Sequence, residues 1–174
     1  MGSDASGFAQ AVLGGWQVNT NVIIQSGLPF EASYRDSGAD RDAGPNRPDV
    51  IGNEGVGSGD GITKPYFNVT PIGTSGSAFS RPAVATFGNE PRNDMTGPGW
   101  WNVDASLFKS FTFGRASTLE FRFEVQNLFN HINLGNPDSQ IGVPGNNNPN
   151  AGFITSMAPN ALTRNLQFGL RFQF

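Results

Sequence analysis

Four aspartates in one stretch come nearest to the spacing of a metal site in this sequence. Asp36, Asp40, Asp42 and Asp49 fall within "DSGADRDAGPNRPD", and carboxylate oxygens are the ligands that calcium prefers. The stretch lacks the ordered pattern of alternating Asp or Asn, the central Gly and the closing bidentate Glu of a calcium loop. A solvated loop is therefore the favoured interpretation, and we predict neither a metal ion nor another cofactor.

Other groups that could perform catalysis are sparse. The chain has no Cys, which excludes thiol chemistry and Cys-ligated zinc, and His131 is the single His, so no His pair can bind a metal. Glu120 and Glu124 would lie on one side of a strand but about 13 Å apart, because each residue of a strand rises roughly 3.3 Å. That separation is too large for a carboxylate dyad. The sequence therefore predicts a protein that is not an enzyme.

Composition narrows the class of protein further. The net charge is -3 and the 11 Lys and Arg residues are scattered, so there is no basic patch for nucleic acid. Gly and Pro account for 23 and 12 residues, and Phe outnumbers Tyr by 15 to 2, a bias that strands favour. No apolar run approaches the roughly 20 residues of a membrane-spanning helix. The first residues show no signal-peptide pattern, and we expect the chain to be a fragment of a longer polypeptide.

Alternation of apolar and polar residues predicts four long strands, near 15–34, 99–113, 117–130 and 163–174. The clearest segment is "STLEFRFEVQ", and the chain closes on "NLQFGLRFQF", in which Gln167 and Arg171 oppose the apolar residues. Each segment has about ten residues, which matches a tilted strand crossing a bilayer. We expect an all-β fold, an antiparallel up-and-down meander of about four long strands that forms part of a transmembrane β-barrel.

The connections between these segments are very unequal. The second and third segments are joined by a turn around Gly114–Ser117, whereas about sixty residues separate the first from the second and over thirty the third from the fourth. Short turns on the periplasmic side and long loops outside are typical of outer-membrane barrels. This asymmetry predicts irregular extracellular loops in the two long connections and places Phe174 at the periplasmic rim.

Aromatic and charged residues give the two faces of the sheet different expected environments. Aromatic side chains favour the boundary between lipid and water, and we expect an aromatic girdle of Trp16, Trp100, Trp101, Phe111 and Phe113. Charged residues on the polar parity predict a wet or plug-filled lumen faced by Glu120, Arg122, Glu124 and Arg171.

Lys109 falls on the apolar parity, and Phe108 falls on the polar parity. Near the rim, the long stem of Lys109 could extend to the headgroups, and a β-bulge at Phe108 and Lys109 is the alternative. A register that places Glu120 beside Arg171 would allow an ion pair in the lumen.

Four strands cannot close a barrel, because the smallest known barrels have eight. The outer strands should therefore pair with strands that are absent from this sequence. A soluble or surface β-sandwich that binds glycans through its long loops is the alternative, since its strands also have one apolar face. A surface adhesin barrel without transport is a third interpretation.

Several segments of the chain resemble the Oar-like TonB-dependent outer-membrane receptors. The similar segments are "LGGWQVNTNVIIQSGLPF", "GNEPRNDMTGPGWWNVDASLFKSFTF", "LEFRFEVQNLFNHINLGNP" and "NLQFGLRFQF". The resemblance implies the C-terminal segment of a 22-stranded barrel in the outer membrane of a Gram-negative bacterium, which imports a bulky ligand. It also implies several partners: outer-membrane lipid, the remaining strands and plug of the full-length chain, a periplasmic energy-coupling protein and the barrel assembly machinery.

In such receptors a terminal aromatic residue after alternating apolar residues is the signal that the assembly machinery reads. The matching residues here are Phe168, Leu170, Phe172 and Phe174. A last lipid-facing strand without a signalling role would show the same parity, but it would not account for a chain that ends on Phe.

Overall fold

The computed structural model describes residues 12–34, 46–113 and 117–174. The chain divides into two compact units. The first, here called the sheet unit, comprises the residues up to Ile24, Trp101–Ile132 and Leu162–Phe174. The second, the loop unit, comprises Gln25–Trp100 and Asn133–Ala161. The strands with the clearest alternation therefore belong to one unit, and the two long connections between them belong to the other.

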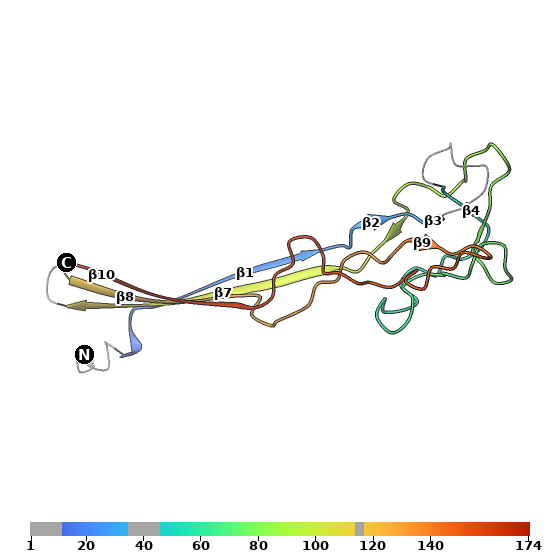
Figure 1. The fold of residues 1–174 in the computed structure, drawn as a ribbon. Coiled ribbons are helices and arrows are strands. Elements are labelled where there is room, and N and C mark those ends of the chain that lie inside the picture. The colour runs from blue at the N-terminus through green and yellow to red at the C-terminus, as the bar shows by residue number, and fades with distance from the viewer. Residues whose placement is uncertain (1–11, 35–45, 114–116) are drawn as a thin grey trace, which may run out of the picture. The chain divides into compact units, whose positions relative to one another are not determined.

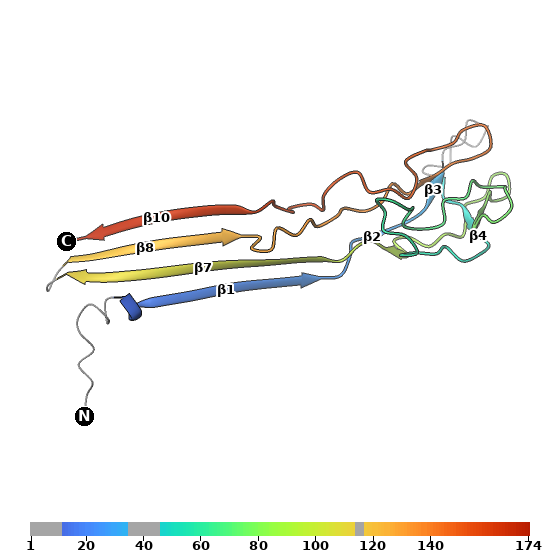
Figure 2. The same ribbon diagram turned by 90° about the horizontal axis from the view of Figure 1, so that it is seen from below.

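Four long strands lie side by side in a single layer (Figure 1 and Figure 2). They are β1 (Trp16–Gln25), β7 (Trp100–Phe113), β8 (Ser117–Gln126) and β10 (Asn165–Gln173). Their order in the sheet is the order in the chain, and both β7–β8 and β8–β10 pair in antiparallel fashion. The predicted fold class, an all-β antiparallel meander of about four long strands, is confirmed.

Two of the long strands end earlier than the sequence predicts. The segment expected at 15–34 stops being one strand after Gln25, and β2 (Pro29–Phe30) and β3 (Ser33–Tyr34) follow as separate short strands. Gly27 lies so close to the backbone that a Cβ there would be 1.8 Å from the carbonyl oxygen of Gly97, and Pro29 has no N–H to give to a ladder. β8 ends at Gln126 because Asn127 takes a positive φ of 52°, which no strand residue adopts.

The register of the sheet is continuous across Phe108 and Lys109, the two residues that depart from the alternation of apolar and polar side chains. β7 pairs with β8 without interruption from Ala105↔Val125 to Phe113↔Ser117. A bulge would place two residues opposite one, so the bulge considered for Phe108 and Lys109 is wrong. Lys109 lies opposite Phe121, and Phe121 in turn lies opposite Leu170 on β10. Lys109 therefore occupies the apolar face of a regular ladder.

Among its described residues, the loop unit contains only very short strands. β2 pairs with β6 (Met95–Thr96), β4 (Asp49–Val50) pairs with β5 (Phe79–Ser80), and β3 runs parallel to β9 (Gln140–Ile141). Each has two residues, so irregular backbone dominates, as the abundance of Gly, Pro and Asn in both long connections predicts. The β3–β9 pair joins the first long connection to the second.

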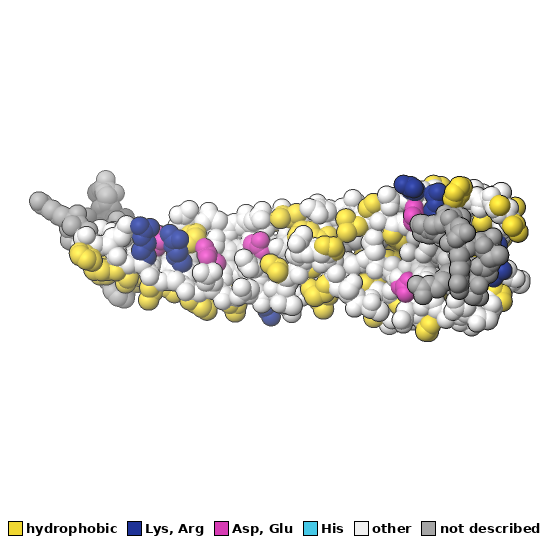
Figure 3. Space-filling model, turned by 45° about the horizontal axis from the view of Figure 1, so that its top comes forward, with side chains coloured by type: hydrophobic (Ala, Val, Ile, Leu, Met, Phe, Trp, Pro, Cys, Tyr) yellow, Lys and Arg dark blue, Asp and Glu magenta, His cyan; other side chains and the backbone are white. Residues whose placement is uncertain are grey.

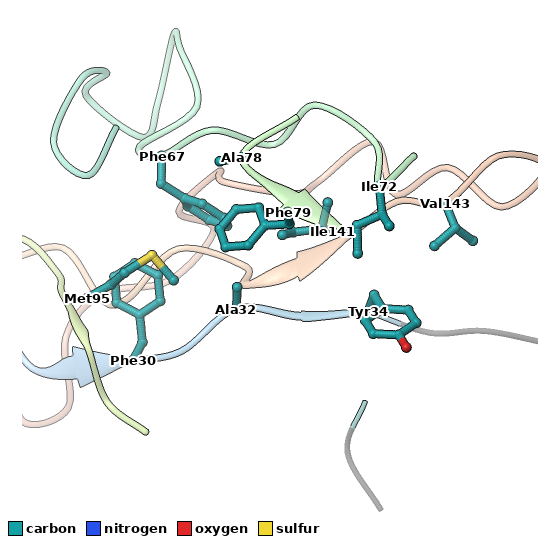
Figure 4. Packing of buried hydrophobic residues seen from close by; sticks show 10 residues of the cluster. All are labelled: Phe30, Ala32, Tyr34, Phe67, Ile72, Ala78, Phe79, Met95, Ile141 and Val143. Carbon is teal, nitrogen blue, oxygen red and sulfur yellow. The ribbon is translucent and has the colours of Figure 1, made fainter. Parts of the chain in front are cut away.

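A hydrophobic core holds the loop unit together (Figure 4). Phe67 contacts Phe30 and Phe79 edge to face, with ring centroids 5.7 and 6.5 Å apart, a favourable geometry for aromatic rings. The other buried members of this cluster are Ala32, Tyr34, Ile72, Ala78, Met95, Ile141 and Val143. The long connections are irregular in backbone but folded around a core, which the sequence pattern did not predict.

Candidate functional site

One face of the sheet unit is apolar across neighbouring strands. Residues directly opposite in a ladder share a face, so the register groups Leu107 with Phe123 and Phe168, and Phe111 with Leu119 and Phe172. Much of this surface is exposed, with Leu170 at 73%. A contiguous exposed apolar surface marks contact with a membrane or another protein.

The opposite face of the same strands is polar. Ser110, Glu120 and Arg171 lie opposite one another. On the same face, Phe108, Arg122 and Gly169 form the next row, and Ser106, Glu124 and Gln167 the row after it. The four residues expected in the lumen, Glu120, Arg122, Glu124 and Arg171, therefore share one face. In the left half of the space-filling view, charged side chains face the viewer and hydrophobic side chains line the lower border (Figure 3).

The ion pair on this face differs from the expected one. Glu120 and Arg171 are direct neighbours in the register, but Glu120 accepts a hydrogen bond from Nε of Arg122, two residues along its own strand. The guanidinium of Arg122 also lies 5.3 Å from the centre of the Phe108 ring. That cation–π contact gives Phe108, an aromatic residue on the polar face, a charged partner.

Toward the other end of the same face, a hollow of about 320 Å³ is lined by Asp104, Glu124 and the amide side chains of Asn19, Asn21 and Gln167, among others. Asp104 accepts hydrogen bonds from the side chain of Asn102 and from the backbone N–H of Asn127. Carboxylates and amides dominate the polar lining, so this hollow suits a polar or cationic group.

Lys109 is the single charged residue within the apolar ladder that the structure describes, and it is 2% exposed. Its ammonium group donates hydrogen bonds to the carbonyl oxygens of Val12 and Gly14, the segment that leads into β1. The rings of Trp16 and Phe111 lie 5.0 and 5.1 Å from the ammonium nitrogen. The charge is therefore satisfied by backbone carbonyls and aromatic faces instead of by extending to solvent.

The five residues expected to form an aromatic girdle lie in different surroundings. Trp16 and Phe111 meet at the Lys109 ammonium group, and Phe113, the last residue of β7, is exposed. Trp101 stacks on His131 near the opposite end of β7. Trp100 belongs to the loop unit, where it lines a hollow of about 270 Å³ with Leu28, Leu134 and other residues.

The C-terminal residues continue the apolar face of β10. Phe168, Leu170 and Phe172 lie opposite Phe123, Phe121 and Leu119. Phe174 follows the last strand residue, is 95% exposed, and stacks on Phe172 with ring centroids 5.8 Å apart. The four residues of the expected assembly signal thus form a continuous apolar edge.

The buried side chain of Asn127 connects two segments of the chain, a role that the sequence pattern did not predict. Its side chain accepts a hydrogen bond from the backbone N–H of His131 and donates to the carbonyl oxygens of His131 and Leu162. The segment after β8 and the segment before β10 are therefore tied together at one end of the sheet. The sequence offered only an indirect signal for the end of β8: Asn is one of the few residues that tolerate a positive φ. The hydrogen bonds of its side chain could not be predicted from that signal.

The His131 ring lies over Trp101 with centroids 4.1 Å apart and 23° between the planes. Phe129 approaches the same indole at 5.9 Å. The sequence predicts that His131 anchors a loop and has no catalytic role. The structure shows that hydrogen bonds to Asn127 hold the His131 backbone and, in addition, that its ring belongs to an aromatic cluster with Trp101 and Phe129.

Among the described carboxylates of the loop unit, Glu90 is the most deeply buried, at 1% exposure. Oε1 accepts a hydrogen bond from the backbone N–H of Ala32, whereas Oε2 of Glu90 and Oε1 of Glu54 are buried without a hydrogen-bond partner among the described residues. Burial raises the pKa of Glu90 to about 7, opposed by the Ala32 N–H and reinforced by Glu54 and Asp94. The carboxyl group therefore changes charge near neutral pH.

Of the four aspartates that were compared with a calcium loop and interpreted as part of a solvated loop, Asp36, Asp40 and Asp42 lie outside the described residues. Asp49 is described, and its carboxylate accepts a hydrogen bond from the backbone N–H of Asn89. Within residues 12–34, 46–113 and 117–174, no group of three or more His, Asp or Glu side chains is arranged to hold a metal ion. None of these described residues forms a helix long and apolar enough to span a membrane.

Comparison with known proteins identifies the class to which the two-faced sheet belongs. No curated protein and no solved structure matches the chain. A family model described as "Outer membrane beta barrel domain" matches residues 1–167, nearly the whole chain. This match places the protein in the outer membrane and identifies the sheet as barrel wall. The chain belongs to the outer membrane β-barrel domain family.

Proposed function

We propose that this chain is the closing segment of a TonB-dependent receptor that imports a bulky ligand and has no enzymatic activity. The main observation in support is the four-stranded sheet, whose outer strands β1 and β10 each have one neighbour among the described strands. In hydrocarbon an unpaired backbone group costs several kcal/mol, so further strands must pair with both edges. The resemblance to Oar-like receptors supports a large barrel with a plug as the source of these strands.

The orientation in the membrane follows from the lengths of the connections. Three residues join β7 to β8, whereas 74 residues join β1 to β7 and 38 join β8 to β10, counted between the strand bounds. Short turns lie on the periplasmic side of outer-membrane barrels. We therefore assign the ends of β1 and β8 at Gln25 and Gln126 to the outside, together with the loop unit that the long connections form.

The two faces of the sheet acquire roles in this arrangement. The apolar face would contact lipid, and the face with Glu120, Arg122, Glu124 and Arg171 would line the lumen against the plug. The edge formed by Phe168, Leu170, Phe172 and Phe174 would be read by the assembly machinery. A β-sandwich module is no longer a competing interpretation, because membership of the barrel family accounts for the exposed apolar face.

Binding to the energy-coupling protein tests the transport role. The natural full-length polypeptide, purified from outer membranes in mild detergent, is passed over the immobilised C-terminal domain of the periplasmic energy-coupling protein from the same bacterium. We expect saturable binding. No binding at concentrations of tens of micromolar would sink the transport proposal in favour of a surface barrel without import, and it would leave the family assignment intact.

A further inference from the structure

We propose that the carboxyl groups of Glu54 and Glu90 form a calcium-binding site inside the loop unit. The site is separate from the aspartates that the sequence led us to compare with a calcium loop. It goes beyond transport, because the bound ion would brace the loops and would do so whether or not the barrel imports a ligand.

Each of the two carboxyl groups has a buried oxygen atom without a hydrogen-bond partner. Glu90 is 1% exposed, and its Oε2 accepts no hydrogen bond from the described residues. Oε1 of Glu54 is buried in the same way and also has no partner among them. A buried carboxylate oxygen without a donor is costly. Such an atom in a folded protein indicates that a water molecule or an ion completes the site.

The two carboxyl groups lie next to each other. Glu54 acts on Glu90 both as a hydrogen-bonding neighbour and through its charge, and Asp94 adds a third negative charge. A hydrogen bond between two carboxyl groups needs a proton on one of them, and two ionised carboxylates side by side repel each other. A water molecule could donate to both oxygens, but it would leave both charges uncompensated. A cation between the two groups satisfies the oxygens and the charges together.

The basic side chains that the structure describes do not supply this positive charge. Arg47 approaches Glu90, but its guanidinium group donates to the backbone carbonyl of Glu90, at 3.0 Å, and not to the carboxylate. No described Lys or Arg forms a salt bridge with the carboxylate of Glu54 or Glu90. The described part of the chain therefore leaves this role to an ion from solution.

Backbone hydrogen bonds hold both glutamates in place. The N–H of Glu90 donates to the carbonyl of Pro48 at 3.1 Å, and the carbonyl of Glu54 accepts from the N–H of Asn68 at 2.7 Å. Oε1 of Glu90 accepts from the N–H of Ala32 at 3.0 Å, and Ala32 belongs to the buried hydrophobic cluster (Figure 4). A bound cation would thus connect the segments of Glu54 and Glu90 at the edge of the core.

The available ligands favour calcium over other metal ions. Carboxylate and carbonyl oxygens suit calcium and magnesium, whereas transition metals favour the nitrogen and sulfur of His and Cys. Magnesium requires a regular octahedron and keeps several waters, which a buried pair of carboxylates accommodates poorly, whereas calcium accepts irregular shells. Two carboxylates are few for calcium, so backbone carbonyls and water would complete the shell. We therefore expect weak binding, with a Kd of about 1 mM, as in extracellular calcium modules.

Hydrogen exchange of the Ala32 amide, which donates to Glu90, provides the test. The natural full-length protein in detergent micelles is freed of metal with a chelator, and exchange at pH 8 is measured with calcium, magnesium or potassium chloride at equal ionic strength. With a Kd of about 1 mM, calcium at about 10 mM should raise the protection of this amide about tenfold. An equal rise with magnesium would overturn the choice of calcium. No rise with calcium, or an equal rise with potassium, would overturn the site.

Variants of the two glutamates locate the site. The calcium effect should disappear in Glu90→Gln and in Glu54→Gln, whereas Glu124→Gln removes a carboxylate from the sheet unit and should respond like the wild type. A calcium effect that persists in Glu90→Gln, or that is lost in Glu124→Gln, refutes the assignment. Glu54 is only half-buried, so Glu54→Gln decides the question if Glu90→Gln does not fold. No readout requires import, so failure of this site and failure of the transport role are distinguishable.

Discussion

At the scale of single residues, Lys109 shows how a charge can stay within an apolar ladder. The sequence placed it correctly on the apolar parity, but two explanations remained: extension to the headgroups or a bulge. The observed solution uses neither, because the carbonyls of Val12 and Gly14 and two aromatic rings surround the ammonium group. Sequence patterns cannot reveal such partners, since Lys109 and Gly14 are 95 residues apart.

Replacement of Lys109 by Met should destabilise the sheet unit. The carbonyl of Gly14 would lose the Lys109 ammonium as its donor, whereas the carbonyl of Val12 would still accept from the indole N–H of Trp16. An unsatisfied buried polar group costs about 1–3 kcal/mol. The free energy of unfolding in detergent micelles, obtained from urea titration, measures the loss. Lys64→Met, a change at an exposed residue of the loop unit, is the control and should stay within about 0.5 kcal/mol of the wild type. An equally small effect of Lys109→Met would contradict a stabilising role for the hydrogen bonds from Lys109 to the segment that leads into β1.

Glu90 makes the stability of the loop unit depend on pH. Its pKa rises from an ordinary 4.5 to about 7 in the folded protein, so the folded state holds the proton more tightly than the unfolded state. The contribution of Glu90 to stability is therefore largest below about pH 4.5, falls as pH rises towards 7, and levels off above it. We expect hydrogen exchange of the Ala32 amide, corrected for intrinsic rates, to show less protection at pH 8 than at pH 5.

Glu90→Gln tests whether the pH dependence comes from the Glu90 carboxyl group and not from another titrating group. The amide keeps the size of the side chain and can donate to Glu54, so protection at pH 8 should increase, by about 1–3 kcal/mol if the unpaired oxygens are satisfied. The difference between pH 5 and pH 8 should shrink. Glu124→Gln on the sheet is the matched control. A pH dependence that survives unchanged in Glu90→Gln would assign the effect to another group.

At the scale of elements, strands were predictable because alternation is a local property. The register could be anticipated as well: Glu120 lies opposite Arg171 if the first residues of β8 are aligned with the last residues of β10. Strand ends were less predictable, since Gln25 and Gln126 are followed by backbone constraints at Gly27 and Asn127. The loop core was not predictable at all, because Phe30, Phe67 and Phe79 share no period and meet only in three dimensions.

Opposite faces of β10 should tolerate a charge very differently. Leu170 lies on the apolar face and Gln167 on the polar face, so Leu170→Arg would put a cation into lipid at a cost of about 2–4 kcal/mol near the bilayer midplane. Gln167→Arg should cost little. Insertion of the full-length variants into phospholipid vesicles, followed by heat-modifiable migration in gels, measures the difference. Equal insertion of the two variants would mean that the lipid-facing side is misassigned.

At the scale of the whole molecule, the sheet and the loop unit should be reached from different compartments. The chain contains no Cys, so single cysteines report position without background from these residues. Ser58→Cys, exposed in the loop unit, should react with a membrane-impermeant maleimide on intact cells. Thr112→Cys, near the short β7–β8 turn, should react only after the outer membrane is permeabilised. The reverse pattern would invert the assigned orientation.

The core of the loop unit also sets an order of events during biogenesis. Its parallel β3–β9 pair joins Ser33–Tyr34 to Gln140–Ile141, and the buried cluster draws residues from both long connections. Contacts between segments so distant in sequence form slowly, because a long stretch of chain must first be closed into a loop. In the proposed orientation, the unit cannot mature while the second connection is still on the periplasmic side. Its completion would thus report that the β8–β10 hairpin has crossed the membrane.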